Sequence, residues 1–258
     1  IYNWEFSVGL EHFVQWGGVS TVLGQQPEKF KDYMNIIMGG EKPDPEYGEE
    51  HNAIGNHLGS YEIYVSKRFE GFNIEAFYNH LFDDGSGRRL GNTPDGRYGI
   101  FLEKNGKDSF INSLIYEFFY THHQSHTTTG RHGADNYFNN STYRSGWTYE
   151  RRVLGAPFFT PDPEGDWFPN NKFTAHHLGI GGRLLNNTFS YPYKLLLSYA
   201  RNDGRYTRPF VPKQDVAYIY SEIGLLRNWM NLDLQVGAEY DSYASPVYGV
   251  GVQARYQF

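Results

Sequence analysis

Residues 248–258 read YGVGVQARYQF, and this stretch alternates between apolar and small or polar side chains. Successive side chains of an extended strand point to opposite faces of a sheet, so one face of this segment is apolar and the other is polar. The pattern predicts a half-buried strand of an antiparallel sheet. It is equally typical of the last strand of a bacterial outer-membrane barrel, which sets its apolar face against lipid and its polar face toward the lumen.

Composition leaves two classes of β-protein open. The mean hydropathy of −0.62 is that of a soluble protein, but the strands and loops of an outer-membrane barrel are also half polar. The chain has 22 tyrosines and 19 phenylalanines, which suits the aromatic girdles of a barrel or an aromatic binding face of a soluble protein. The absence of cysteine excludes disulfides and thiolate chemistry. A net charge of −6 argues against nucleic-acid binding.

The alternation of the last segment recurs along the chain and predicts about ten strands. For residues 216–226 the two faces cannot be assigned from the pattern. The chain begins inside such a segment and without methionine, which predicts a mature chain or a fragment. The predicted strands span residues 2–11, 60–67, 73–79, 98–103, 113–121, 174–185, 193–200, 216–226, 232–240 and 248–258.

The connections between these segments alternate in length. Short ones are predicted near residues 70–71, 105–106, 186–187 and 228–231, and 242–247 is short as well. Long ones are predicted at residues 17–57, 83–97, 122–172 and 201–214. Short periplasmic turns opposite long extracellular loops are the outer-membrane pattern. The sequence therefore predicts an all-β, antiparallel transmembrane outer-membrane β-barrel with long extracellular loops.

One long connection is expected to carry a helix. In QPEKFKDYMNIIMGG, residues 26–40, Pro27 suits a helix start and the two glycines a helix stop. Its apolar side chains fall on one face at helical spacing, and we expect that face to pack into the barrel mouth or against a partner. The side chains of this face are Phe30, Tyr33, Met34, Ile37 and Met38.

Several stretches resemble the capsule-assembly Wzi family of outer-membrane proteins. They are GLEHFVQWGG (9–18), QPEKFKDYMNIIMGG (26–40), NAIGNHLGSYE (52–62), DDGSGRRLGNTPDGRYGI (83–100), DNYFNNSTYRSGWTYERRVLGAPFFTP (135–161) and AHHLGIGG (175–182). The resemblance implies that residues 1–258 are the C-terminal part of a single barrel domain of more than ten strands. It also implies a lectin-like, non-enzymatic anchor for capsular polysaccharide, without a cofactor, in the bacterial outer membrane.

Further partners are expected from that location. They are outer-membrane lipid and lipopolysaccharide, other outer-membrane proteins, and the barrel-assembly machinery, whose recognition signal the terminal Phe258 resembles. The resemblance carries over no binding residues, so the candidate site rests on side-chain chemistry alone.

Arginines are concentrated in three of the long connections, whereas the predicted lumen faces carry acids. Guanidinium groups pair with carboxylates and phosphates, aromatic rings can stack on sugar faces, and asparagines can bond hydroxyls. Two alternatives stay open: the arginines bind lipopolysaccharide phosphates or nearby acids, and the aromatics pack the loop into a plug. The polysaccharide-binding candidates are Arg88, Arg89, Arg131, Asn136, Tyr137, Arg144, Trp147, Arg151, Arg152 and Arg205.

Other chemistries are weaker in the sequence. Three close histidines, His122, His123 and His126, have His132 near them but no carboxylate at zinc-site spacing, so no metal site is predicted. His80 near Asp83, Asp84 and Ser86 suggests a lipase, although no G-x-S-x-G motif is present. A porin with a cation-favouring, glutamate-lined lumen is the main alternative function.

Overall fold

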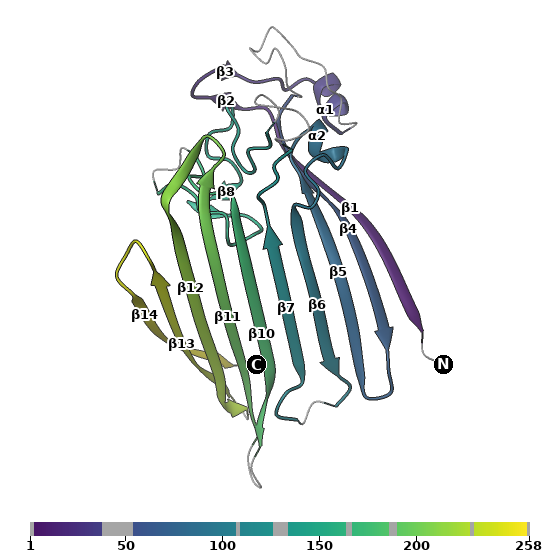
Figure 1. Ribbon diagram of the computed structural model, residues 1–258, viewed down its shortest axis with the longest axis vertical. Coiled ribbons are helices and arrows are strands. Elements are labelled where there is room, and N and C mark those ends of the chain that lie inside the picture. Colours follow the sequence, from purple (N-terminus) through teal and green to yellow (C-terminus); the bar gives the residue numbers. More distant parts are fainter. Residues whose placement is uncertain are drawn as a thin grey trace.

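The computed structural model describes residues 3–37, 54–106, 109–125, 134–163, 167–185, 190–227 and 230–256. One antiparallel ten-stranded sheet dominates it, in the order β1-β4-β5-β6-β7-β10-β11-β12-β13-β14 (Figure 1). Its ten strands coincide with the ten predicted segments, so the all-β class and the strand number are confirmed. They are β1 (Trp4–Gln15), β4 (Asn56–Arg68), β5 (Phe72–Phe82), β6 (Gly96–Lys104), β7 (Ser113–Tyr120), β10 (Phe173–Leu185), β11 (Ser190–Arg205), β12 (Arg208–Arg227), β13 (Met230–Asp241) and β14 (Val247–Tyr256).

The register sorts polar and apolar side chains onto opposite faces of the sheet. Directly paired residues share a face of the sheet. Glu117 pairs with His177, and Glu239 pairs with Tyr218. Ser198 pairs with both His177 and Tyr218, so the two predicted lumen acids lie on the same face. We call this polar side the inner face. The register also settles β12, because Tyr218 pairs with Glu239 on the inner face and Ile219 pairs with Ala238 on the opposite face. The sequence did not reveal this alternation, because tyrosines such as Tyr218 occupy the inner face of β12 and neither face is strongly polar.

The opposite, outer face is apolar and uncovered. Val8 of β1 is 80% exposed, Ile219 of β12 is 51% exposed and Val250 of β14 is 77% exposed. Apolar patches of more than a few hundred Å² are rare on soluble monomers. None of the helices in the described residues is long and apolar enough to cross a membrane.

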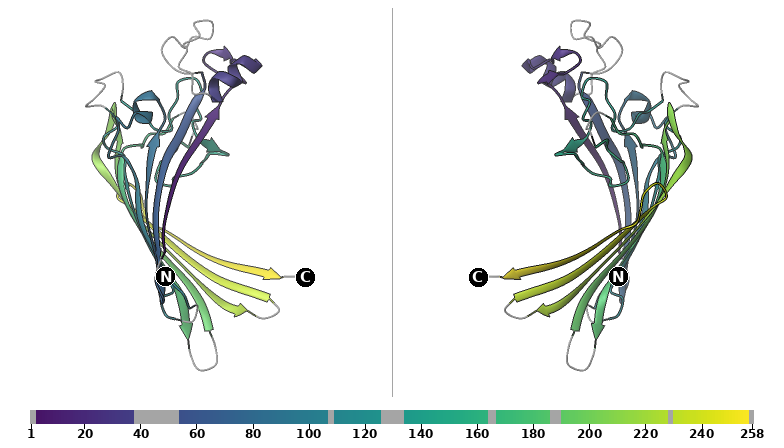
Figure 2. Two further views of the ribbon diagram at one scale, coloured as in Figure 1. Left: turned by 90° about the vertical axis from the view of Figure 1, so that its right-hand side faces the viewer. Right: turned by 90° about the vertical axis from the view of Figure 1, so that its left-hand side faces the viewer.

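The sheet is curved and open. Figure 2 shows that the teal segment around the short strands β8 (Thr148–Tyr149) and β9 (Arg152–Val153) lies on the inner side of the curve. Strands β1 and β14 are the two edges, and the described residues of these edges do not pair with each other. Closure into a barrel is therefore not part of this structure.

One predicted connection is wrong. Strands β11 and β12 continue through residues 201–214 and are joined by a tight turn at 206–207. Asp, Gly and Pro in this stretch suggested a loop, but a β-bulge between Asn202 and Gly204 absorbs the irregularity, and Gly204 adopts a φ of 83°. The short turn before β5 and the long connections at 16–55, 83–95 and 121–172 are confirmed. Residues 186–189 and 228–229, where two short turns are predicted, lie outside the described residues.

The predicted helix is present, but its orientation differs from expectation. Helix α1 (Phe30–Ile37) follows the short strands β2 (Val19–Ser20) and β3 (Gly24–Gln25). It buries Asp32 and Ile36, whereas Phe30 is 77% exposed and Ile37 is 51% exposed. The prediction that the apolar face packs into the barrel mouth is therefore wrong for these residues, and contact with a partner stays a prediction. Met38 lies outside the described residues.

A glycine in the long loop gives a direct test of its packing. Gly146 has a φ of 56°, and a Cβ there would overlap the carbonyl oxygen of Phe138 and approach the Phe168 ring to 2.9 Å. We expect Gly146→Ala to lower the free energy of unfolding by about 3 kcal/mol, because it combines backbone strain with overpacking. Denaturant titration measures this change.

Gly155→Ala is the matched control for this prediction. Gly155 also has a positive φ, 91°, but no atom of the described residues comes within 4 Å of the point that an alanine Cβ would occupy. Only the strain of a left-handed backbone, about 1–2 kcal/mol, is expected there. Equal losses in the two variants would show that the loop does not pack as described.

Candidate functional site

The long connection between β7 and β10 folds back onto the inner face and forms the aromatic core of the protein. Tyr137 has no exposed surface, Phe138 is 3% exposed and Trp147 is 9% exposed. Phe138 stacks on Phe159 with ring centroids 4.0 Å apart. These three side chains are therefore packed into the loop core instead of being exposed at the surface, as the plug alternative predicts. The core consists of Phe119, Tyr137, Phe138, Trp147, Phe158, Phe159, Phe168, Phe173, Ala175 and Ala200.

A buried carboxylate ties this loop to the connection between β5 and β6. Asp95 is fully buried, and it accepts hydrogen bonds from the backbone N–H groups of His123 and Gln124, both at 2.8 Å. The Tyr137 hydroxyl donates a third bond to it, also at 2.8 Å. Burial raises the pKa of Asp95, while the three hydrogen bonds oppose that shift. Asp95 is thus a buried polar anchor of the loop.

Two of the predicted arginines meet at a tryptophan that the sequence analysis did not select. The guanidinium carbon of Arg144 lies 5.0 Å from the ring centroid of Trp167, and that of Arg205 lies 5.4 Å from it. Cation–π contacts of this kind hold guanidinium groups in place. The Nε atom of Arg205 is inaccessible to solvent and, among the described residues, has no hydrogen-bond partner. One donor of this pair is therefore held in place without an acceptor.

A cavity of about 300 Å³ lies beside this cluster. Trp167, Arg151 and Tyr149 line it, and the Tyr149 ring is 68% exposed. Glu150 and Asp162 also line it. The cavity therefore contains carboxylates that can accept hydrogen bonds from sugar hydroxyl groups, in addition to the cationic side chain of Arg151. We call Arg144, Tyr149, Arg151, Trp167 and Arg205 the Trp167 site. Trp167 follows a Gly–Asp pair in a Pro-rich stretch, a loop signal that could have identified it.

The other candidates are not placed in this site. Arg88 ends helix α2 (Gly85–Arg88) and Arg89 caps it, on the connection between β5 and β6. Arg152 is exposed on β9. Asn136 is exposed, and its Oδ1 accepts bonds from Asn139 and Asn171 within the loop. Arg131 lies outside the described residues.

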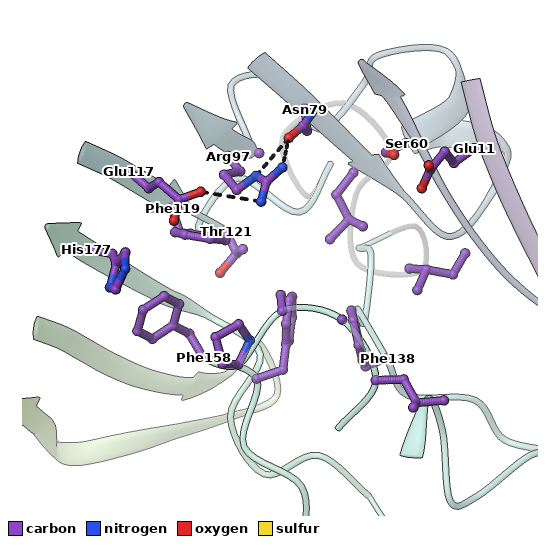
Figure 3. A pocket seen from close by; sticks show the side chains of 18 of the residues that line it. Glu11, Ser60, Asn79, Arg97, Glu117, Phe119, Thr121, Phe138, Phe158 and His177 are labelled. Atoms are coloured by element: carbon purple, nitrogen blue, oxygen red, sulfur yellow. Dashed lines mark hydrogen bonds and ion pairs between the residues drawn. The ribbon is translucent and has the colours of Figure 1, made fainter. Parts of the chain in front are cut away.

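A larger cavity of about 650 Å³ separates the loop from the inner face (Figure 3). Phe138 and Phe158 border it from the loop side. On the sheet side, Arg97 donates to the side-chain carbonyl oxygen of Asn79 at 2.5 Å and lies 3.4 Å from a Glu117 oxygen. The inner face therefore carries a paired cation here rather than a free one.

The lipase alternative is not supported by the geometry. His80 is buried, with one ring nitrogen 3.0 Å from the Tyr78 hydroxyl and the other 3.0 Å from the Gly87 carbonyl oxygen. Ser86 bonds Asp84 and Asp135 instead. Both nitrogens of the expected base are engaged elsewhere, so these residues form no nucleophile–base pair.

The remaining histidines do not form a metal site among the described residues. His122 lies 3.6 Å from Asp203, and burial lowers its pKa although that carboxylate opposes the shift. His126 and His132 lie outside the described residues. The three-carboxylate group that the structure does bring together comprises Asp83, Asp84 and Asp135.

Comparisons with known proteins give no match: no family model, no curated protein and no solved structure matches this chain. The resemblance to the Wzi family therefore stays a prediction.

Proposed function

We propose that this protein is an outer-membrane protein that binds an acidic surface polysaccharide at the Trp167 site without catalysing a reaction. The observation that carries the proposal is the pair of guanidinium groups at one tryptophan, Arg144 and Arg205, beside an exposed tyrosine. The experiment that tests it is binding of a purified acidic polysaccharide to the whole chain.

The membrane part of the proposal rests on the outer face of the sheet. Ten strands expose aliphatic and aromatic side chains on this face, and lipid is the partner that accepts such a surface without specific contacts. Glutamates of the same strands, such as Glu117 and Glu239, are directed to the inner face, as in a lumen. In this arrangement the sheet is part of a barrel, with lipid and lipopolysaccharide around it.

The binding part rests on the chemistry of the Trp167 site. Guanidinium groups bind carboxylates and phosphates through two parallel N–H donors, and two such groups, those of Arg144 and Arg205, lie against Trp167. The exposed ring of Tyr149 suits the apolar face of a pyranose. A uronate-containing or phosphate-containing polymer therefore fits better than a neutral one.

Affinity in such a site comes from repetition. An ion pair of the exposed Arg151 contributes only about 0–1 kcal/mol, and a single sugar unit engages few charged groups at once, so it binds weakly. A polymer presents many equivalent units to many copies of the protein, and linked binding events raise the overall avidity by about 10²–10⁴-fold. The proposed role is therefore retention of a long polymer at the cell surface.

Salt should weaken this retention. Raising the ionic strength from about 0.1 M to about 1 M shortens the Debye length from about 10 Å to about 3 Å. We expect the apparent affinity of immobilised protein for an acidic polysaccharide to fall at least about tenfold over this range, because salt screens the ion pairs between the arginines and the polymer. Biolayer interferometry measures it, and a salt-independent affinity would argue against arginine-based recognition.

A porin is the second candidate, and the inner face favours it. Glu11, Glu62 and Glu117 line the larger cavity, and an acidic lumen attracts cations. Single-channel recording separates the two functions. Steady cation-selective conductance would favour the porin, whereas a nearly silent protein would favour the binding role, since the loop core occupies the inner side of the sheet.

A further inference from the structure

Three carboxylates from two connections converge near the top of β5. Asp83 and Asp84 lie just after β5, and Asp135 belongs to the long connection before β10. Each offers an oxygen that lies within 4.8 Å of an oxygen of the other two. Close carboxylates repel one another unless a proton or a cation lies between them.

The group lacks compensation at Asp83. Oδ1 of Asp83 is inaccessible to solvent and has no hydrogen-bond partner in the part of the chain that the structure describes. An enclosed carboxylate oxygen without a hydrogen-bond partner is costly, and Asp83 has two further carboxylates close to it.

Two serine hydroxyl groups add further oxygen atoms to the group. The Ser125 hydroxyl donates to Asp135 Oδ2 at 2.6 Å. The Ser86 hydroxyl lies 2.7 Å from Asp84 Oδ1 and 3.2 Å from Asp135 Oδ1. Hard divalent cations prefer oxygen ligands, and Ca²⁺ accepts irregular sets of about six to eight of them, whereas Mg²⁺ demands a near-octahedral one.

We propose that Asp83, Asp84 and Asp135 bind a calcium ion that joins the connection after β5 to the long connection before β10. The sequence analysis predicted no metal site, because Asp135 lies about 50 residues from its partners and no motif links them. The ion neutralises the enclosed Asp83 oxygen and fixes the loop that carries the Trp167 site. This inference concerns a site separate from polysaccharide binding and does not depend on that function.

Terbium luminescence tests the proposal on the whole purified chain. Tb³⁺ occupies Ca²⁺ sites and emits when a nearby aromatic ring absorbs light. Tyr137 is a suitable donor, since it lies two residues after Asp135 in the chain. We expect a saturable signal that added Ca²⁺ displaces. Asp83→Asn and Asp135→Asn should each weaken Tb³⁺ binding about 100-fold or more, because changes even to outer-shell partners cost about 10–100-fold.

Thermal unfolding keeps the test independent of folding defects. Without metal, each Asp→Asn variant should be at least as stable as the parent protein, because it removes one of three mutually repelling charges. Ca²⁺ should then raise the unfolding temperature of the parent and of a Glu103→Gln control, which changes an exposed β6 acid, but not that of the two variants. No terbium signal, equal binding in all four proteins, or binding of Mg²⁺ in preference to Ca²⁺ would overturn the proposal.

Discussion

Replacement of Asp95 by alanine is expected to lower the free energy of unfolding by about 4 kcal/mol. The substitution leaves three donors without their acceptor: the N–H groups of His123 and Gln124 and the hydroxyl of Tyr137. Gln124 and Tyr137 have no exposed surface, and each buried unsatisfied donor costs about 1–3 kcal/mol. Denaturant unfolding followed by tryptophan fluorescence measures the loss, since Trp147 and Trp167 both lie in the affected connection.

Two further variants define the cause of this loss. Asp95→Asn retains one carbonyl acceptor but turns an N–H₂ group toward a donor, so we expect a loss of about 2 kcal/mol. Asp215→Ala is the control, because Asp215 accepts the Tyr199 hydroxyl at an exposed position, and removing it should cost less than about 1 kcal/mol. If Asp95→Ala were no more harmful than Asp215→Ala, the long connection would not be anchored as described.

The second large effect concerns recognition and rests on the proposed function. A double variant, Arg144→Ala with Arg205→Ala, is expected to weaken binding of an acidic polysaccharide about 30-fold or more. Both guanidinium groups are half-buried, and charge-assisted hydrogen bonds at such positions contribute about 1.5–3 kcal/mol each, where about 1.4 kcal/mol is a factor of ten. Trp167→Ala should act in the same direction, because it removes the ring against which both cations lie.

The matched control is a double variant of arginines outside the Trp167 site, Arg88→Ala with Arg89→Ala. It removes the same charge from the connection after β5. If binding depended only on net charge, the two double variants would weaken it equally. A much smaller effect in the control is expected if the geometry at Trp167 matters, and an equal effect would replace the site with a diffuse basic surface.

The strands of this protein could be predicted from sequence because their two faces differ in polarity. Residues 248–258 are an example: each apolar residue is followed by a glycine or a polar residue, and the register of β14 on β13 preserves that division. A one-residue slip would exchange the faces, so the pattern also determines the register. Strand β12 shows where this pattern stops being informative. Tyr218 and Ile219 both have large hydrophobic side chains, yet they lie on opposite faces of the sheet.

The candidate site was harder to predict because it depends on contacts between distant segments. Tyr137 and Trp147 are residue types that often stack on sugars. In the fold, both belong to one buried aromatic cluster with Phe159 and Phe168. Arg144 and Arg205 are about 60 residues apart in the chain, and only the extension of β11 to Arg205 brings the second one to Trp167. The acids at residues 83, 84 and 135 were equally separate in sequence. Local patterns predict strands, whereas such juxtapositions follow from the fold.

The most direct test of the central claim compares two forms of one polymer. The whole chain is immobilised, and its binding to a purified acidic capsular polysaccharide is measured beside binding to the same polysaccharide after chemical reduction of its carboxyl groups to alcohols. Recognition by the Trp167 site predicts tight binding of the acidic form and at least about tenfold weaker binding of the reduced form, with the difference lost in the Arg144→Ala, Arg205→Ala variant. Equal binding of the two forms, or a difference that persists in the variant, would contradict the account.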